Sequence, residues 1–277
     1  MNPVAKAVWL IETQLGAELS LDAIAEAAGV SRFHLAHAFG YATGLSVMRY
    51  LRGRRLSEAA RALAAGAPDI LGVALDAGYG SHEAFTRAFR EQFGVTPESV
   101  RDRRRLDHLS LMEPLTMSAN TNTQLEPPRF VEGKAFLVAG LSARYTFATN
   151  QGIPLQWQRF APHIGQIPGQ VGDTTYGVCW NGDDAGNFDY VAGVEVSSFA
   201  DLGDEFARVR IPAQRYVVFA HRGHASEIRD TVAAIWSRWL PSSGHRVADA
   251  PNFERYGPEF DPKTGTGLVE FWIPLAS

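Results

Sequence analysis

The 277 residues are 45% hydrophobic and 20% charged, ordinary values for a folded globular protein that exclude wholesale disorder. At roughly 150 residues per domain, this length predicts two domains, and no apolar run approaches the ~18 residues of a membrane span. The single cysteine, Cys179, excludes an intramolecular disulfide and a zinc knuckle. No secretory signal is visible at the amino terminus, so we expect a cytoplasmic protein.

The net charge of −4 is divided unequally along the chain. Residues 1–108 carry 13 Lys and Arg against 12 Asp and Glu, whereas residues 109–277 carry 13 against 18. The first part contains two arginine clusters, Arg49, Arg52, Arg54 and Arg55 and then Arg101, Arg103, Arg104 and Arg105. Such clusters suggest a phosphate-binding face, although a solvated helix surface explains the charge equally well.

Residues 1–108 have the pattern of an all-helical domain, because apolar residues recur at helical spacing between glycine and proline stop signals. Two segments repeat the same order of a short helix, a glycine turn and a new helix start, at residues 21–31 and 70–81. A long helix over 47–65 is expected to join them. A short glycine-containing turn between two helices is typical of the helix-turn-helix, whose second helix enters the DNA major groove.

This part of the chain, about residues 4–105, resembles the DNA-binding domain of the AraC family of transcription regulators. The second unit carries Ala77-Gly78-Tyr79, Ser81, Phe85, Arg87, Phe89, Phe93-Gly94-Val95-Thr96-Pro97 and Arg101. The first unit carries Gly29-Val30-Ser31, Leu35, Phe39, Thr43-Gly44, Tyr50, Arg54 and Ala59. The resemblance implies two helix-turn-helix units in one chain, and it implies a structural ion pair for Arg54.

The helical periodicity separates the core face of each second helix from the face that is expected to meet DNA. In the first unit the predicted DNA-facing residues are Arg32, Phe33, Ala36 and His37, and in the second they are His82, Glu83, Thr86, Arg87 and Arg90. Arginine can bind guanine bidentately and glutamate can accept from cytosine, each contact giving ~1–3 kcal/mol of discrimination. A phosphate contact or a surface ion pair is the alternative for the arginines.

Residues 109–128 are polar and end in Pro127-Pro128, which predicts an exposed linker. From residue 129 to 277 the pattern predicts an α+β domain of two pseudo-symmetric strand-helix-strand-strand modules with a groove between them. The first module is expected at 136–145, 153–164, 175–181 and 188–196, and the second at 215–221, 226–240, 252–256 and 268–274.

This second part resembles the GyrI-like effector-binding domain. The matching runs include Tyr176-Gly177-Val178, Tyr190-Val191-Ala192-Gly193-Val194-Glu195-Val196, Trp239-Leu240-Pro241-Ser242-Ser243-Gly244, Phe253-Glu254-Arg255-Tyr256 and Glu270-Phe271-Trp272-Ile273-Pro274. Gln214 stands where that family tends to have glycine. The resemblance implies a small effector of the multidrug type, lipophilic or cationic.

A carboxylate among aromatic side chains is suited to an apolar cation, through charge pairing and cation–π contact. The candidate ligand-binding residues are Glu195, Tyr190, Trp157, Tyr176, Phe219, Glu270 and Trp272. Strand alternation puts Glu195 and Tyr190 on opposite faces unless a bulge intervenes. A structural role is the alternative for both acids, and a core position is the alternative for each aromatic residue.

The sequence therefore predicts a sequence-specific transcription regulator whose partners are double-stranded DNA, a small-molecule effector and, if it is an activator, RNA polymerase. No cofactor, metal or membrane partner is expected, since His221 and His224 point to opposite strand faces without further ligands. Two alternatives stay open. The second domain is a hydrolase with Glu195 as general base, or it is a protein-binding module like a gyrase-inhibiting relative of the GyrI-like domain.

Overall fold

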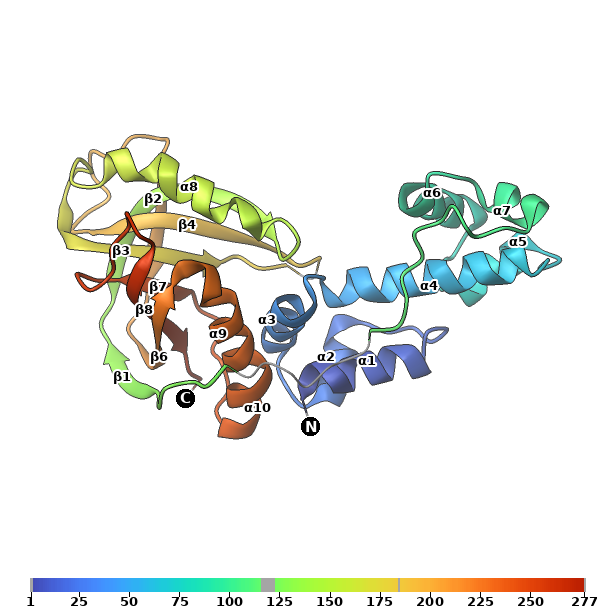
Figure 1. The fold of residues 1–277 in the computed structure, drawn as a ribbon, viewed down its shortest axis with the longest axis horizontal. Coiled ribbons are helices and arrows are strands. Elements are labelled where there is room, and N and C mark those ends of the chain that lie inside the picture. The colour runs from blue at the N-terminus through green and yellow to red at the C-terminus, as the bar shows by residue number, and fades with distance from the viewer. Residues whose placement is uncertain (1, 116–122, 184, 277) are drawn as a thin grey trace.

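A computed structural model describes residues 2–115, 123–183 and 185–276. Figure 1 shows a helical amino-terminal region and a carboxy-terminal region in which helices lie against a sheet. The amino-terminal helices are α1 (Pro3–Thr13), α2 (Leu21–Ala28), α3 (Arg32–Thr43), α4 (Val47–Ala64), α5 (Ile70–Asp76), α6 (His82–Phe93) and α7 (Pro97–Arg103). The predicted all-helical first domain is confirmed.

The two helix-turn-helix units have matching ends. The side chains of Ser31 and Ser81 accept the backbone N–H groups of the first turns of α3 and α6, both at 3.2 Å. Gly44 and Gly94 end the same helices in the left-handed conformation, which glycine adopts without steric cost. Local sequence therefore gives α3 and α6 the same length and the same caps.

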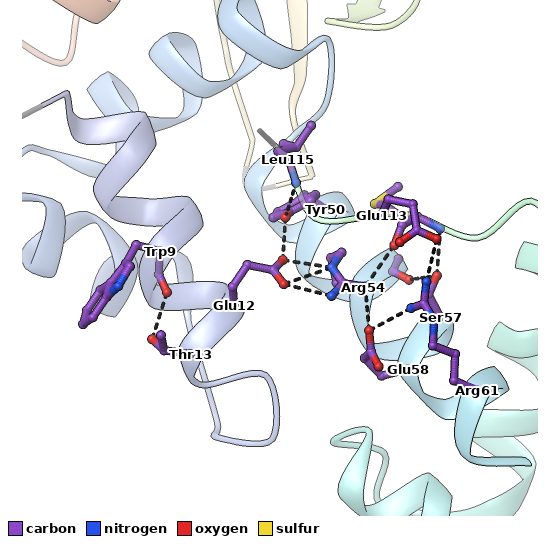
Figure 2. Close-up of polar contacts among 12 residues, drawn as sticks. Trp9, Glu12, Thr13, Tyr50, Arg54, Ser57, Glu58, Arg61, Glu113 and Leu115 are labelled. Carbon is purple, nitrogen blue, oxygen red and sulfur yellow. Dashed lines mark hydrogen bonds and ion pairs between the residues drawn. The ribbon is translucent and has the colours of Figure 1, made fainter. Parts of the chain in front are cut away.

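Helix α4 joins the two units, and a buried arginine fixes its packing (Figure 2). Arg54, only 3% exposed, forms ion pairs with Glu12 of α1 at 2.8 Å and with Glu58 at 2.9 Å. It also donates to the carbonyl oxygen of Met112 at 3.0 Å. The ion pair expected for Arg54 is present, so this guanidinium belongs to the core of the domain.

The segment after α7 lies along α4 over its described residues. Met112 donates its backbone N–H to the Ser57 hydroxyl at 2.8 Å, and Leu115 donates to the Tyr50 hydroxyl at 3.1 Å. Residues 109–115 thus pack on α4, whereas the sequence predicted an exposed linker. Of the rest of that predicted linker, residues 116–122 lie outside the described residues.

Within the described residues, eight strands form one antiparallel sheet in the order β1-β6-β8-β7-β3-β4-β2-β5. The strands are β1 (Arg129–Gly133), β2 (Phe136–Thr146), β3 (Gln170–Trp180), β4 (Asn187–Val196), β5 (Ala207–Ile211), β6 (Gln214–His224), β7 (Asn252–Tyr256) and β8 (Thr266–Pro274). The helices of this region are α8 (Ile153–Phe160) and the continuous run of α9 (Ile228–Ala234), the π-helical η4 (Ile235–Trp239) and α10 (Leu240–Ser243).

The sheet has the predicted two-module symmetry, with β7 and β3 meeting at its centre. Each module is preceded by a short strand that pairs with the other module: β1 pairs with β6, and β5 pairs with β2. Only Pro212 and Ala213 separate β5 from β6, although these strands lie near opposite ends of the strand order. The sheet must therefore curl so that its two ends approach each other.

The two faces of the sheet have different cover. On one face α8 packs on β2 and β4, while α9 packs on β6. The other face, inside the curl, holds a cluster of aromatic residues that includes Tyr176, Tyr216, Phe253 and Trp272. No helix of the described residues is long and apolar enough to cross a membrane.

Candidate DNA-reading helices and effector site

Helix α6 presents its predicted DNA-facing residues to solvent. Phe85 and Phe89 are fully buried in the core of the second unit, so the opposite face of α6 points outward. All five predicted residues of this helix line one open depression of about 430 Å³: His82, Glu83, Thr86, Arg87 and Arg90. The structure thus brings these five side chains together on one accessible face.

Helix α3 presents the corresponding face to the carboxy-terminal region. The His37 ring stacks on Trp236 of η4 with centroids 4.8 Å apart, and Phe33 meets the same indole edge-on at 6.0 Å. His34 contacts the carbonyl oxygen of Trp236 through Nε2 at 3.1 Å. Figure 1 shows α3 next to α9, and the contacts join α3 to both α9 and η4.

All four predicted DNA-facing residues of α3 line a pocket shared with the carboxy-terminal region. Arg32, Phe33, Ala36 and His37 form one wall of this pocket of about 290 Å³, and its other wall includes Phe147 and Asp183. Burial lowers the pKa of His37 to about 4, opposed by its contact with the Phe33 carbonyl. His37 is therefore neutral at pH 7.

Two glycines allow the two regions to approach closely. A Cβ at Gly40 of α3 would lie 2.1 Å from the Phe147 ring, and a Cβ at Gly186 would lie 2.4 Å from Cβ of Ser46. Real Cβ atoms do not approach their neighbours so closely. The contact between α3 and the carboxy-terminal region is therefore as tight as packing within a domain.

On the helix-covered face, the centre of the sheet holds a glutamate bound by tyrosines. Tyr190 of β4 and Tyr256 of β7 both donate to Oε2 of Glu254, at 2.7 and 2.8 Å. Trp157 of α8 donates its indole N–H to the Tyr190 hydroxyl at 2.9 Å. Trp157 also packs edge-on against Tyr256, with ring centroids 5.2 Å apart. Neither hydroxyl binds Oε1 of Glu254.

Strand register explains how this cluster forms. Glu254 is paired across the sheet with Phe271 on β8 and Gly177 on β3, so all three share one face. A Cβ at Gly177 would lie 2.1 Å from the Tyr190 hydroxyl and 2.5 Å from Oε2 of Glu254. Glycine at 177 therefore leaves the space in which the tyrosine meets the carboxylate.

The electrostatics of the cluster disfavour a bare anion. Burial raises the pKa of Glu254, although the hydrogen bonds from Tyr190 and Tyr256 act in the opposite direction. Burial also raises the pKa values of both tyrosines well above the usual range, so they remain neutral donors. A carboxylate in this position gains from a nearby cation, which replaces the lost hydration.

A fourth aromatic residue reaches the cluster from the amino-terminal region. Tyr41 of α3 packs against the core cluster that contains Tyr190 and Cys179, and its ring lies 5.4 Å from Phe147. Burial, with the nearby Cys179 and Glu254, raises the pKa of Tyr41 well above its usual value. Tyr41 is thus the link between α3 and the Glu254 cluster.

Of the seven predicted ligand-binding residues, Trp157 and Tyr190 meet at Glu254. Phe219 lies on the same sheet face but under the other helix, packed edge-on against Trp239. The remaining four lie on the opposite face: Tyr176, Glu195, Glu270 and Trp272. The structure therefore does not bring the seven residues into one site.

The two glutamates predicted for the site have protein partners on that opposite face. Glu195 accepts from the Tyr176 hydroxyl at 3.3 Å. Glu270 is ion-paired with Arg129 and, at 3.1 Å, with Arg255, and these arginines lower its pKa against the effect of burial. Glu270, neutralised by two arginines, fits the structural role that the sequence left open, whereas Glu195 is separated from Tyr190 and Trp157 because it lies on the other face of the sheet.

Sequence reasoning did not single out Glu254, Tyr256 or Tyr41. The alternation of Glu254 and Tyr256 in one short strand was a usable signal, since residues i and i+2 share a face. That this face is the one carrying Tyr190 depends on pairing through β3, which the sequence does not show. Within the described residues, no group of three His, Cys, Asp or Glu side chains is placed to hold a metal ion.

Comparison with known proteins gives two family matches. Residues 126–276 match the GyrI-like small molecule binding domain, and residues 24–103 match a helix-turn-helix domain. The transcriptional regulator Rob of Salmonella typhimurium is 28% identical over 284 residues, which are 97% of this chain and 96% of Rob. The transcriptional regulator BrlR of Pseudomonas aeruginosa is 34% identical over 149 residues, 53% of this chain and 54% of BrlR.

Among solved structures, SAV2435 bound to tetraphenylphosphonium is 18% identical to this chain, with a TM-score of 0.47. The match covers 55% of this chain and 95% of SAV2435. The fold and the family matches define a DNA-binding transcription regulator with a small-molecule-binding domain. The chain belongs to the GyrI-like family, with an AraC-type helix-turn-helix region at its amino-terminal end.

Proposed function

We propose that this regulator senses a lipophilic organic cation, which binds at Glu254 among Trp157, Tyr190 and Tyr256. The observation that carries the proposal is the partly buried carboxylate whose pKa is raised and which accepts hydrogen bonds from two tyrosines. A delocalised cation would pair with the carboxylate and lie against the electron-rich ring faces. Small, strongly hydrated cations would lose more hydration free energy than their interactions at this site provide.

The charge requirement is tested with a matched pair of ligands. Tetraphenylphosphonium carries one positive charge among phenyl rings, and triphenylphosphine oxide offers phenyl rings without the net charge. We expect calorimetry to show that the full chain binds the cation at least tenfold more tightly. Glu254→Gln keeps the shape of the side chain and should remove most of that preference, at about 1.4 kcal/mol per factor of ten.

Glu195→Gln is the matched control, because it removes a strand carboxylate from the opposite sheet face. It should leave the preference for the cation unchanged. Equal cation binding by the wild type and Glu254→Gln would exclude Glu254 as the recognition group. Recovery of the intact ligand after long incubation would separate a sensor from the hydrolase alternative.

The cation affinity should also depend on pH in a defined direction. The ionised form of Glu254 binds the cation, and the raised pKa means that protonation starts at a higher pH than for an ordinary glutamate. Affinity should therefore fall as the pH falls through that raised pKa, and cation binding should release protons. Calorimetry in two buffers of different ionisation enthalpy measures the protons released.

For DNA recognition we propose that α6 reads bases with Arg87 and Arg90, which lie exposed on the open face of that helix. Arginine is suited to bidentate binding of guanine in the major groove. If the protein activates transcription, RNA polymerase is its further partner. The test is selection of duplexes from a random pool by the full chain, followed by substitution of Arg87, which should relax the preference at one base position.

A further inference from the structure

One face of α3 makes all the contacts with the carboxy-terminal region described above. Phe33, His34, His37, Gly40 and Tyr41 are spaced by three to four residues or are neighbours, so they form one stripe along the helix. The amino-terminal part of the stripe packs on Trp236, the middle on Phe147, and the carboxy-terminal part near Glu254. The stripe therefore joins the predicted DNA-reading surface to the candidate effector site.

The same stripe cannot be used for DNA while these contacts exist. The major groove is about 12 Å wide and admits one helix, which with its side chains is about 10–12 Å across. Phe33 and His37 are in ring contact with Trp236, so a second helix occupies the space that DNA would need. For α3 to read DNA, it must first separate from η4.

A bound effector also conflicts with these contacts. Trp157, Tyr190 and Tyr256 are tied to each other and to Glu254 by hydrogen bonds of 2.7–2.9 Å. Tyr41 is held by packing against Phe147 and the adjoining core, and it belongs to a different region of the molecule. A ligand that reaches Glu254 displaces Tyr41 at a lower cost than the hydrogen-bonded residues.

We infer that α3 is an autoinhibitory lid, which covers the effector site in this structure and is released for DNA reading when an effector displaces Tyr41. This inference rests on the proposed function, because it takes the Glu254 cluster as the effector site. Effector binding and DNA reading by α3 both favour the separated position of the helix. By linkage, each must strengthen the other by the same factor.

The lid can be locked by a disulfide between α3 and the loop that follows β2. Cγ of Phe147 lies 2.2 Å from the Cβ position of Gly40, so with a C–C bond of about 1.5 Å the two Cβ atoms are at most ~3.7 Å apart. The Cβ atoms of a disulfide are about 3.5–4.5 Å apart, so the bond can close once the two backbones move slightly apart at this contact. The native Cys179 is buried and burial raises the pKa of its thiol, which keeps it out of exchange.

The experiment compares the oxidised and reduced forms of the full-length double variant Gly40→Cys/Phe147→Cys. A duplex is first enriched from a random pool by the reduced protein in the presence of tetraphenylphosphonium, and its binding is then followed by anisotropy. We expect the cation to raise the DNA affinity of the reduced protein at least tenfold and to leave the oxidised protein unchanged. Reduction of the oxidised sample should restore the response.

Two other results are distinguishable. The lid inference is wrong, and the proposed sensing site stands, in either of two cases. In the first, the reduced protein binds both DNA and the cation, but the cation does not change its DNA affinity. In the second, the cation raises the DNA affinity of the oxidised form equally. If the reduced protein and the wild type both fail to bind the cation, the proposed effector site fails, and the lid, which rests on it, falls with it.

Gly40→Ala gives an independent test without a cross-link. Alanine is about 1 kcal/mol more favourable than glycine within a helix. Its Cβ, however, would clash with the Phe147 ring, whose atoms are the nearest to that position. We expect this variant to bind the selected duplex several-fold more tightly without the cation. The control is Gly16→Ala between α1 and α2, where a Cβ would make only an ordinary 3.7 Å contact with the Asp76 carbonyl oxygen, so DNA affinity should not change. Unchanged affinity in Gly40→Ala would contradict the lid.

Discussion

Helices α3 and α6 occupy equivalent places in two copies of one motif, yet one is covered and the other is open. Their serine caps accept hydrogen bonds of the same length, but the outward face of α3 meets Trp236 while that of α6 lines an open depression. A repeated motif therefore specifies the local structure of a recognition helix and not its availability to DNA. Availability depends on what else in the chain packs on that face.

The difference is visible in the side chains of the two helices. Apart from Arg32, α3 carries aromatic and apolar residues on its outward stripe, whereas α6 carries Glu83, Arg87 and Arg90. Burial of aromatic rings against another protein surface is favourable in free energy, whereas burial of charged side chains is unfavourable because they lose hydration. The composition of α3 suits an interface between domains, and that of α6 suits a solvated face next to phosphates.

The largest expected effect comes from removing the ring that covers α3. Trp236, 2% exposed, packs on both α3 and the sheet core, so Trp236→Ala should lower the free energy of unfolding by about 3–5 kcal/mol. Because α6 lies at the end of α4 that is remote from α9 and α10 (Figure 1), hydrogen exchange in α6 should not change, while exchange in α3 accelerates. Denaturant titration and exchange on the same variant check both parts. Equal acceleration in the two helices would mean that the cover is not specific to α3.

Acidification should weaken the packing of α3 on Trp236, because His37 is neutral in this contact and gains a proton at low pH. Its folded-state pKa of about 4 lies below the 6.5 of an exposed histidine, so the unfolded or separated state binds more protons. The stability that neutral His37 contributes to the covered form is fully present above pH 6.5 and is lost as the pH falls toward 4. At pH 5 the loss is about 2 kcal/mol. His34, whose pKa burial also lowers, acts in the same direction.

The measurement is the free energy of unfolding at pH 7 and pH 5 for the wild type and for His37→Phe. Phenylalanine keeps a ring on Trp236 but does not titrate, so the variant should lose less stability on acidification by about this amount. If both proteins lose the same free energy of unfolding between pH 7 and pH 5, protonation of His37 does not cause the loss of stability.

A pair of variants compares the arginines of the two helices. Without effector, Arg87→Ala in α6 should weaken binding to a selected duplex by about 1–3 kcal/mol, whereas Arg32→Ala in α3 should have little effect because its helix cannot enter the groove. With tetraphenylphosphonium present, both substitutions should cost affinity. Anisotropy titrations with and without the cation measure this. A loss in Arg32→Ala without effector would show that α3 already reads DNA.

The smallest effect is expected at the two helix caps. Ser31→Ala and Ser81→Ala each remove one capping hydrogen bond of the same length, so each should cost about 1 kcal/mol. Hydrogen exchange in the first turn should increase in α6 but much less in α3, where contacts with Trp236 hold the same turn in place. Equal fraying of both first turns would argue that the cover adds no local stability.

Much of the fold was predictable because it depends on local signals. Ser20, Gly29 and Pro97 mark helix ends through their own backbone preferences, and the strand–helix periodicity located both modules of the second domain. The repeated short helix and glycine turn identified the two helix-turn-helix units. These signals act within a few residues, so a single sequence is sufficient to read them.

The site was less predictable because it depends on contacts between distant residues. Tyr190 and Glu254 are 64 positions apart, and they meet only because β3 places Gly177 between their strands. His34 and Trp236 are 202 positions apart, and no periodicity links them. Alternation did put Glu195 and Tyr190 on opposite faces, which the structure shows, but it did not identify the acid on the Tyr190 face.

Hydrogen exchange of the full-length wild type with and without tetraphenylphosphonium tests the central claim, that α3 is covered until an effector releases it. The account predicts that saturation with the cation increases exchange in α3 and around Trp236, while exchange in α6 stays the same. Unchanged or slower exchange in α3, with the cation demonstrably bound, would contradict it.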